Sequence, residues 1–281
     1  MTAQATNVLP FPDNEPKVSV VSVTPEMARR WLSRNDNNRH LRGVTVTQYA
    51  RDMKNGRWQI TGESIKFNAE GALLDGQHRL AAIVKAGVTV PMVVMRGIPD
   101  SAQRVMDTGQ ARTASDALAM KGEKHTSILA AAIRIAIGME AEEPDPGKYA
   151  VTHAEVEQFL GEHPEMRGAA EFASQVARRT DCPPAVVAYT FWRFAQVVDV
   201  YAAANFWTAA SDKVGLAAGD PVIALTNRFA EARRNREVLP KRVLLSLIYR
   251  AWNARREHKT MRFIRVNSPA GGLVPIPELR D

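Results

Sequence analysis

Apolar and polar residues follow a strand-like pattern in four short stretches of the first hundred residues. Residues 18–23 combine Val with Ser, which is typical of a strand covered on one face. Residues 64–67 and 72–74 are apolar runs on either side of Asn-Ala-Glu-Gly, a sequence typical of a hairpin turn. Residues 90–96 form the last such run. These stretches predict a small sheet of four strands.

Segments with the 3.6-residue period of a helix lie between these strands and dominate the rest of the chain. In the first hundred residues we expect a helix capped by Thr24 with Pro25 in its first turn, a second over residues 46–54, and a third that ends at Lys85. From about residue 115 the sequence is rich in Ala and has no strand pattern. Helices are expected there over residues 125–140, 153–160, 169–179, 186–201, 205–210, 222–234 and 241–256.

The two patterns divide the chain into parts. We expect an α+β fold, with an N-terminal α+β domain at residues 18–112 and an all-helical domain at residues 113–265. Residues 1–17, where prolines lie among polar residues, are expected to be a flexible tail, and residues 266–281 a C-terminal tail. A chain of 281 residues is long enough for one to two domains with substantial cores.

The most informative motif is Asp75-Gly76-Gln77-His78-Arg79, which leads from an apolar strand into a helix that continues Leu-Ala-Ala. A helix N-terminus leaves main-chain N–H groups unpaired and carries partial positive charge, so it attracts phosphate. Gly76 would let the backbone approach a ligand closely, and the guanidinium of Arg79 can bind phosphate oxygens with two donors. The motif therefore predicts a phosphate-binding turn.

The same residues also fit an ordinary turn. Asp-Gly is a common turn pair, and Asp75 can cap a helix whose apolar residues pack in the core. In that interpretation, His78 and Arg79 lie on the solvated side of the helix. Residue chemistry alone leaves both interpretations open.

The order of elements around this motif resembles the ParB/sulfiredoxin superfamily over about residues 18–100. ParB partition proteins carry Gly-Glu-Arg-Arg at the equivalent turn, followed by a helix of small residues, a glycine and a Val-Pro strand, and sulfiredoxins carry Gly-Cys-His-Arg there. The Asp-Gly-Gln-His-Arg variant resembles the DGQHR-type ParB-like proteins of phages and actinobacteria, including DndB of DNA phosphorothioation systems. Residues 35–39, Asn-Asp-Asn-Asn-Arg, resemble the Asn-Pro-x-Gln-Pro-Arg element of ParB.

The resemblance implies a nucleotide site. As in ParB, a nucleoside triphosphate (CTP or ATP, with Mg²⁺) would be held by Gly76, Gln77, His78 and Arg79, with Arg39 approaching from the first loop. Hydrolysis is in doubt, because Gln77 and His78 replace the Glu and the first Arg of the ParB motif. Reduction of a sulfinic acid is not expected, since Gln77 stands where sulfiredoxins have their reactive cysteine.

The resemblance implies a DNA-associated, ParB-like nucleotide-binding protein of phage or mobile-element type. Nucleotide occupancy would bias domain arrangement or formation of a homodimer. The first alternative is a metal-dependent nuclease or phosphoryl-transfer enzyme that uses His78 and an acid, Asp75, Glu63 or Asp107. The second is a transcriptional regulator or adaptor like DndB, in which the motif serves structure or ligand sensing.

The C-terminal part of the chain is rich in Arg and Lys. The whole chain has a net charge of +7, which favours polyanionic partners such as DNA. Aromatic residues are interleaved with these cations and few acids offset them. We therefore predict that DNA is bound by Arg242, Arg250, Arg255, Arg256, Lys259 and Arg262. The alternative is a solvated helix face whose apolar side packs in the core.

Several classes of protein do not fit the sequence. No apolar run approaches the roughly 18 residues of a membrane span and no signal peptide is visible, so we expect a cytoplasmic protein without a membrane partner. One cysteine excludes an intramolecular disulfide, and no P-loop sequence is present. Asp107 and Arg112, after the last predicted strand, are further candidates for closing over the site or, in the case of Asp107, for binding Mg²⁺.

Overall fold

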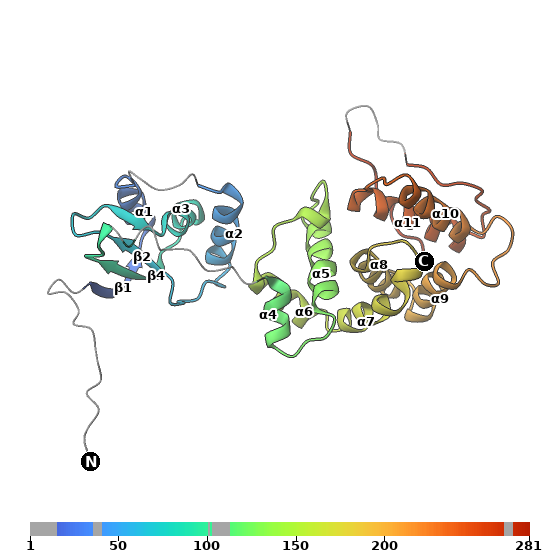
Figure 1. The fold of residues 1–281 in the computed structure, drawn as a ribbon, viewed down its shortest axis with the longest axis horizontal. Coiled ribbons are helices and arrows are strands. Elements are labelled where there is room, and N and C mark those ends of the chain that lie inside the picture. Colours follow the sequence, from blue (N-terminus) through green and yellow to red (C-terminus); the bar gives the residue numbers. More distant parts are fainter. Residues whose placement is uncertain (1–15, 36–40, 101, 103–112, 267–271) are drawn as a thin grey trace, which may run out of the picture. The chain divides into compact units, whose positions relative to one another are not determined.

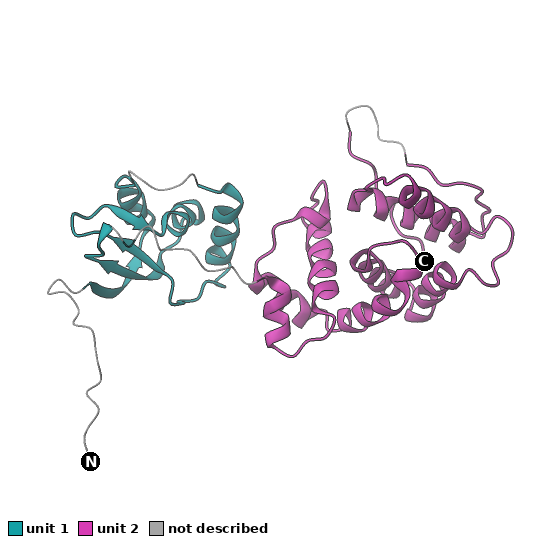
Figure 2. Ribbon diagram, viewed as in Figure 1, with its two compact units in different colours: residues 1–111 teal, residues 112–281 magenta. Residues whose placement is uncertain are grey.

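The chain folds into two compact units, residues 1–111 and residues 112–281 (Figures 1 and 2). The computed structural model describes residues 16–35, 41–100, 102, 113–266 and 272–281. These residues hold one sheet of four strands and eleven α-helices. The fold is therefore mixed and mostly helical, as the sequence predicts. Residues 1–15 of the predicted tail, and Arg39, Asp107 and Arg112, lie outside the described residues. The predicted tail extends to residue 17, but Lys17 is already part of the first strand, where it is paired with Arg96.

The sheet of the first unit consists of β1 (Lys17–Val23), β2 (Ser64–Phe67), β3 (Leu73–Asp75) and β4 (Val90–Arg96). Their order is β1-β4-β2-β3. β1 and β4 are antiparallel, β2 and β4 are parallel, and β2 and β3 form an antiparallel hairpin. All four strands lie where the sequence predicts them, with β3 shifted by one residue.

Three helices accompany the sheet: α1 (Pro25–Leu32), α2 (Gly43–Lys54) and α3 (Gln77–Ala86). The hydroxyl of Thr24 accepts a hydrogen bond from the Met27 N–H at 3.1 Å, so α1 begins at the predicted cap. α2 begins three residues before the predicted position. Apolar side chains from the sheet and the helices form one core, which includes Ile65, Phe67, Leu80, Ile83 and Val94.

The described part of the second unit contains helices and no strand. The α-helices are α4 (Ala114–Met120), α5 (Thr126–Glu140), α6 (His153–Glu162), α7 (Met166–Val176), α8 (Pro184–Val197), α9 (Val200–Asp212), α10 (Pro221–Arg234) and α11 (Lys241–Arg256). Single 3₁₀ turns lie at Pro146–Lys148 and Ala177–Arg179.

The single helix predicted over residues 186–201 is wrong. α8 ends at Val197, and Asp199 begins α9 by accepting a hydrogen bond from the Ala202 N–H at 2.7 Å. Apolar residues continue across this break, so hydrophobic periodicity does not mark it. The local signal that separates the two helices is Asp199, the N-cap residue of α9.

A cluster of aromatic side chains joins α8, α9 and α11. The rings of Phe194 and Trp252 are stacked with their centroids 4.0 Å apart, and Phe206 meets Trp252 edge to face at 5.6 Å. All three residues are buried. Aromatic pairs of this kind add about 0.5–1.5 kcal/mol each beyond the area they bury.

Residues 272–281, expected as part of a tail, lie along α11 and run in the same direction. Side chains of α11 donate hydrogen bonds to main-chain oxygens of this segment: Arg242 Nε to Val274 (2.6 Å), Ser246 Oγ to Pro275 (2.7 Å), Asn253 Nδ2 to Glu278 (2.6 Å) and Trp252 Nε1 to Arg280 (2.9 Å). The segment thus belongs to the packed body of the second unit.

Within the part of the chain that the structure describes, no helix has both the length and the apolar composition that crossing a membrane requires.

Removing residues 267–281 should destabilise the second unit. Each lost hydrogen bond is worth roughly 1 kcal/mol, so we expect the free energy of unfolding to fall by roughly 2–4 kcal/mol. Urea denaturation followed by circular dichroism measures the change, and deletion of Asp281 alone serves as the control. Equal stability of the full and shortened chains would contradict the packed role of the segment.

Candidate functional site

The predicted motif lies at the junction between β3 and α3. Gly76 is the N-cap residue of α3 and has φ = 101°, a conformation that favours glycine. A Cβ atom at this position would lie 3.0 Å from the Cα of Ile65, which is part of β2. The turn therefore needs glycine for two reasons, its backbone conformation and its close approach to the neighbouring strand.

Asp75 does not cap α3, so that part of the ordinary-turn interpretation is wrong. Its Oδ1 accepts from the N–H of Gly76 at 2.6 Å, and Gly76 itself has no side chain with which to cap the helix. Its Oδ2 accepts from Lys66 Nζ at 2.8 Å and from Arg79 Nη2 at 3.3 Å. The carboxylate of Asp75 is thus bound to Lys66 on β2 and to Arg79 on α3.

These contacts set the protonation of Asp75. Burial raises the pKa of the carboxyl group, but the hydrogen bond from Lys66, the charges of Arg79 and Lys66, and the Gly76 N–H outweigh it, so that the pKa lies below its usual 3.8. Asp75 is therefore a carboxylate at neutral pH and a weak base. This disfavours its use as a general base in catalysis.

The Arg79 side chain is buried and points at groups of its own unit. Nη2 donates to the main-chain oxygen of Ser64 at 2.8 Å, and Nη1 donates to Glu63 Oε2 at 3.2 Å. Together with the contact to Asp75, these bonds tie α3 to both strands of the hairpin. Direct binding of phosphate by Arg79, as the motif predicts, would require it to exchange these partners.

Gln77 and His78 connect the first turn of α3 to Asn35 and Arg42. Gln77 Oε1 accepts from Asn35 Nδ2 at 3.0 Å, and His78 Nε2 accepts from the main-chain N–H of Arg42 at 3.0 Å. A neutral His78 therefore carries its proton on Nδ1. The motif thus lies beside both described ends of the segment that contains Arg39, although Arg39 itself is not among the described residues.

Lys66 is the residue of this site that the sequence analysis missed. It faces Asp75 across the β2–β3 hairpin as its Cα partner, next to a shift in the register between Lys66 and Phe67. Equal spacing from a turn at residues 68–71 would place Lys66 opposite Leu73. The pairing with Asp75 depends on a register shift between Lys66 and Phe67, which the hydrophobic pattern does not indicate.

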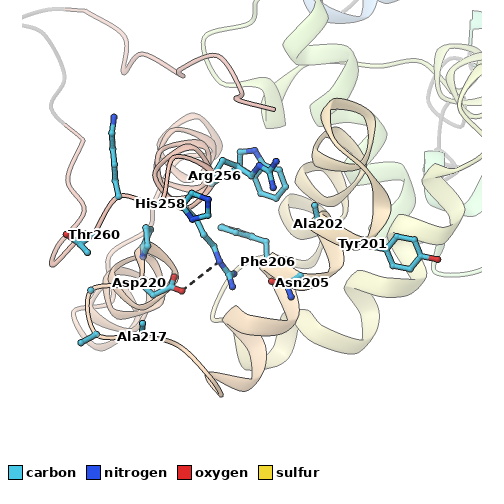
Figure 3. A pocket seen from close by; sticks show the side chains of 15 residues that line it. Tyr201, Ala202, Asn205, Phe206, Ala217, Asp220, Arg256, His258 and Thr260 are labelled. Carbon is cyan, nitrogen blue, oxygen red and sulfur yellow. Dashed lines mark ion pairs between the residues drawn. The ribbon is translucent and has the colours of Figure 1, made fainter.

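The predicted DNA-binding residues of the second unit fall into two groups. Arg242 bonds to the C-terminal segment and Arg250 is half-buried, so both are partly covered by their own unit. Arg255 and Arg256 end α11, Lys259 follows it, and all three line one cavity, in which Figure 3 labels Arg256. Arg262, which is exposed, lines a neighbouring cavity.

No group of three or more His, Cys, Asp or Glu side chains is placed to hold a metal ion among the described residues. If Mg²⁺ arrives with a triphosphate, phosphate oxygens and water supply most of its ligands, as is usual for this ion.

Comparison of the chain with protein-family models, with curated proteins and with solved structures gave no match. The resemblance to the ParB/sulfiredoxin superfamily therefore stays a prediction that rests on the motif and the order of elements around it.

Replacing Gly76 by Ala should destabilise the first unit. The residue must adopt φ = 101° and its Cβ would press on the backbone of Ile65, so we expect a loss of roughly 2–4 kcal/mol in the free energy of unfolding. Gly56→Ala is the matched control, since Gly56 also has positive φ but open space at its Cβ. Equal losses for the two variants in urea denaturation would contradict the close approach.

Asp75→Asn should lower stability at neutral pH by roughly 1–2 kcal/mol, because it removes a charged acceptor from Lys66 and Arg79. The pKa of Asp75 is lowered in the folded protein, so its contribution is present above about pH 4 and is lost as the pH falls through the folded value. The difference between wild type and variant should therefore shrink below about pH 4 in urea denaturation. Glu70→Gln, at an exposed acid, serves as the control, and a difference independent of pH would count against the assigned pairing.

Proposed function

We propose that the protein is a DNA-associated, ParB-like protein that binds a nucleoside triphosphate at the first turn of α3. The observation that carries this proposal is the β3–Gly76–α3 junction, where a helix of ten residues starts directly from a strand without a side-chain cap. Main-chain N–H groups of such a turn, together with the positive end of the helix, suit phosphate oxygens.

In this proposal Asp75 and Arg79 act as positioning residues. Their mutual contact, and the bonds of Arg79 to Ser64 and Glu63, hold the hairpin and α3 in register. Phosphate oxygens are then bound by the main chain of the first turn and by the side chains of Gln77 and His78. The segment that includes Arg39 would supply further positive charge.

The DNA association rests on the charge of the second unit. Residues 255–265 contain five Arg and Lys residues and a single acid. Four of these cations are exposed and Arg255 is half-buried. Exposed cations neutralise the phosphates of a DNA backbone, and binding of this kind weakens with added salt.

A regulator or adaptor without catalytic turnover is the second candidate. It is favoured by the way Asp75 and Arg79 are engaged with each other and with the hairpin, which leaves Asp75 as a weak base. Under this candidate a nucleotide binds and stabilises the first unit, and no phosphate is released.

Thermal unfolding of the full chain with CTP, ATP, GTP or UTP and Mg²⁺ tests the nucleotide site. A ligand at about one hundred times its dissociation constant should stabilise the protein by about 2.7 kcal/mol, which raises the melting temperature clearly. Gln77→Glu should abolish this shift, because a carboxylate at the first turn of α3 repels phosphate. The variant can still accept the hydrogen bond from Asn35, so the local contact is kept.

Gln59→Glu is the matched control, since it makes the same chemical change at an exposed position of the first unit. It should keep the nucleotide shift. Absence of a shift with every nucleotide in wild type, or an equal shift in Gln77→Glu, would refute the triphosphate site. A shift without release of phosphate would support the regulator or adaptor over an enzyme.

A further inference from the structure

A cavity of about 620 Å³ lies in the second unit between α9, the loop before α10, and the end of α11 (Figure 3). Its floor includes Phe206 and Trp252, which are buried in the aromatic cluster. Its walls carry Arg255, Arg256 and Lys259. Three cations and two buried aromatic residues therefore line one cavity.

Arg255, which lines this cavity, has a guanidinium donor that no acceptor in the described part of the chain uses. Its Nη1 atom is buried and has no acceptor among the described residues. Its Nε lies 3.8 Å from Asp220 Oδ2, an ion pair that is too long for a hydrogen bond (dashed line in Figure 3). A buried donor without an acceptor is unfavourable, and a planar guanidinium matches the oxygens of a phosphate group.

The charges at the cavity do not cancel. Asp220 is the one acid among the lining residues, against Arg255, Arg256 and Lys259. Glu257, which lies outside the lining, pairs with Lys259 at 2.5 Å. The surplus of positive charge favours an anionic ligand.

The walls of the cavity are fixed by their own contacts. Met261 N–H donates to the main-chain oxygen of Gly219 at 2.7 Å, which ties the segment after α11 to the loop before α10. Asp220 Oδ1 accepts from the Val222 N–H at 2.8 Å and so caps α10. The position of Asp220 is therefore set before any ligand binds.

We propose that this cavity binds a phosphate group of a DNA strand, with Arg255 as the residue that contacts it. Asp220 holds the guanidinium in place when the cavity is empty and competes with the phosphate for it. Arg262 and Arg265 follow the lining residues in the sequence and are exposed, and these additional cations favour a polymer over a free phosphate. The inference rests on the DNA association proposed above and is independent of the nucleotide site in the first unit.

Fluorescence anisotropy with a labelled DNA oligonucleotide tests this inference on the full chain. Arg255→Met should weaken DNA binding about tenfold. It should also make the slope of log affinity against log salt concentration shallower by the amount expected for about one phosphate contact. Asp220→Asn should strengthen binding by roughly two- to fivefold, because the amide still caps α10 but no longer neutralises Arg255. A residue that serves only the fold would not give these opposite changes.

Arg179→Met is the control, since it removes an exposed arginine of the same unit that pairs with Asp212 away from the cavity. Its affinity for DNA should stay within about twofold of wild type, because lone exposed pairs contribute little. Should Arg255→Met fail to fold, Arg255→Lys keeps the charge but loses the planar fork, and a loss of affinity is still expected.

Three outcomes would overturn the inference. Unchanged DNA binding by both Arg255 variants would refute phosphate binding in the cavity but would leave the proposed DNA association intact. Failure of wild type to bind DNA at all would refute the DNA association, and the inference with it. Displacement of the oligonucleotide by inorganic phosphate at an equal concentration of phosphate groups would assign the cavity to a free anion instead of a strand.

Discussion

Burial of the Arg79 guanidinium is the constraint on which the described part of the first unit depends. A buried charge without partners costs several kcal/mol, so the unit folds only when acceptors surround it. Those acceptors are the Ser64 main-chain oxygen, Glu63 and Asp75, which come from both strands of the hairpin and the residue before it. They meet at Arg79 only if the hairpin is in register and α3 starts at Gly76. One side chain therefore fixes strand pairing and the position of the turn together.

Elements whose ends are set by local chemistry were predictable from the sequence. β4 and α11 have the predicted bounds because each is a continuous apolar pattern between residues that cannot extend it. The Thr24 cap is likewise confirmed by its hydrogen bond. The division between α8 and α9 was not found, because the apolar pattern is the same on both sides and the break depends on one capping residue, Asp199.

The site was predictable in its position and less so in its contacts. The Asp-Gly sequence after an apolar run locates the strand-to-helix junction correctly. It does not say that Arg79 turns inward, since that depends on acceptors up to 16 residues away in the sequence. At the basic end of α11, too, the position was predictable and the contacts were not. Its cations are visible in the sequence, but the pairing of Arg255 with Asp220 arises from packing between segments 35 residues apart.

The segment at residues 272–281 also governs the order in which the second unit can be completed. A growing chain leaves the ribosome from its N-terminus, so α8, α9 and α11 are synthesised before the segment that accepts hydrogen bonds from α11. Until that segment emerges, the indole N–H of Trp252 lacks its acceptor, the main-chain oxygen of Arg280. The hydrogen bonds between α11 and residues 272–281 therefore form only after α11 itself has been synthesised.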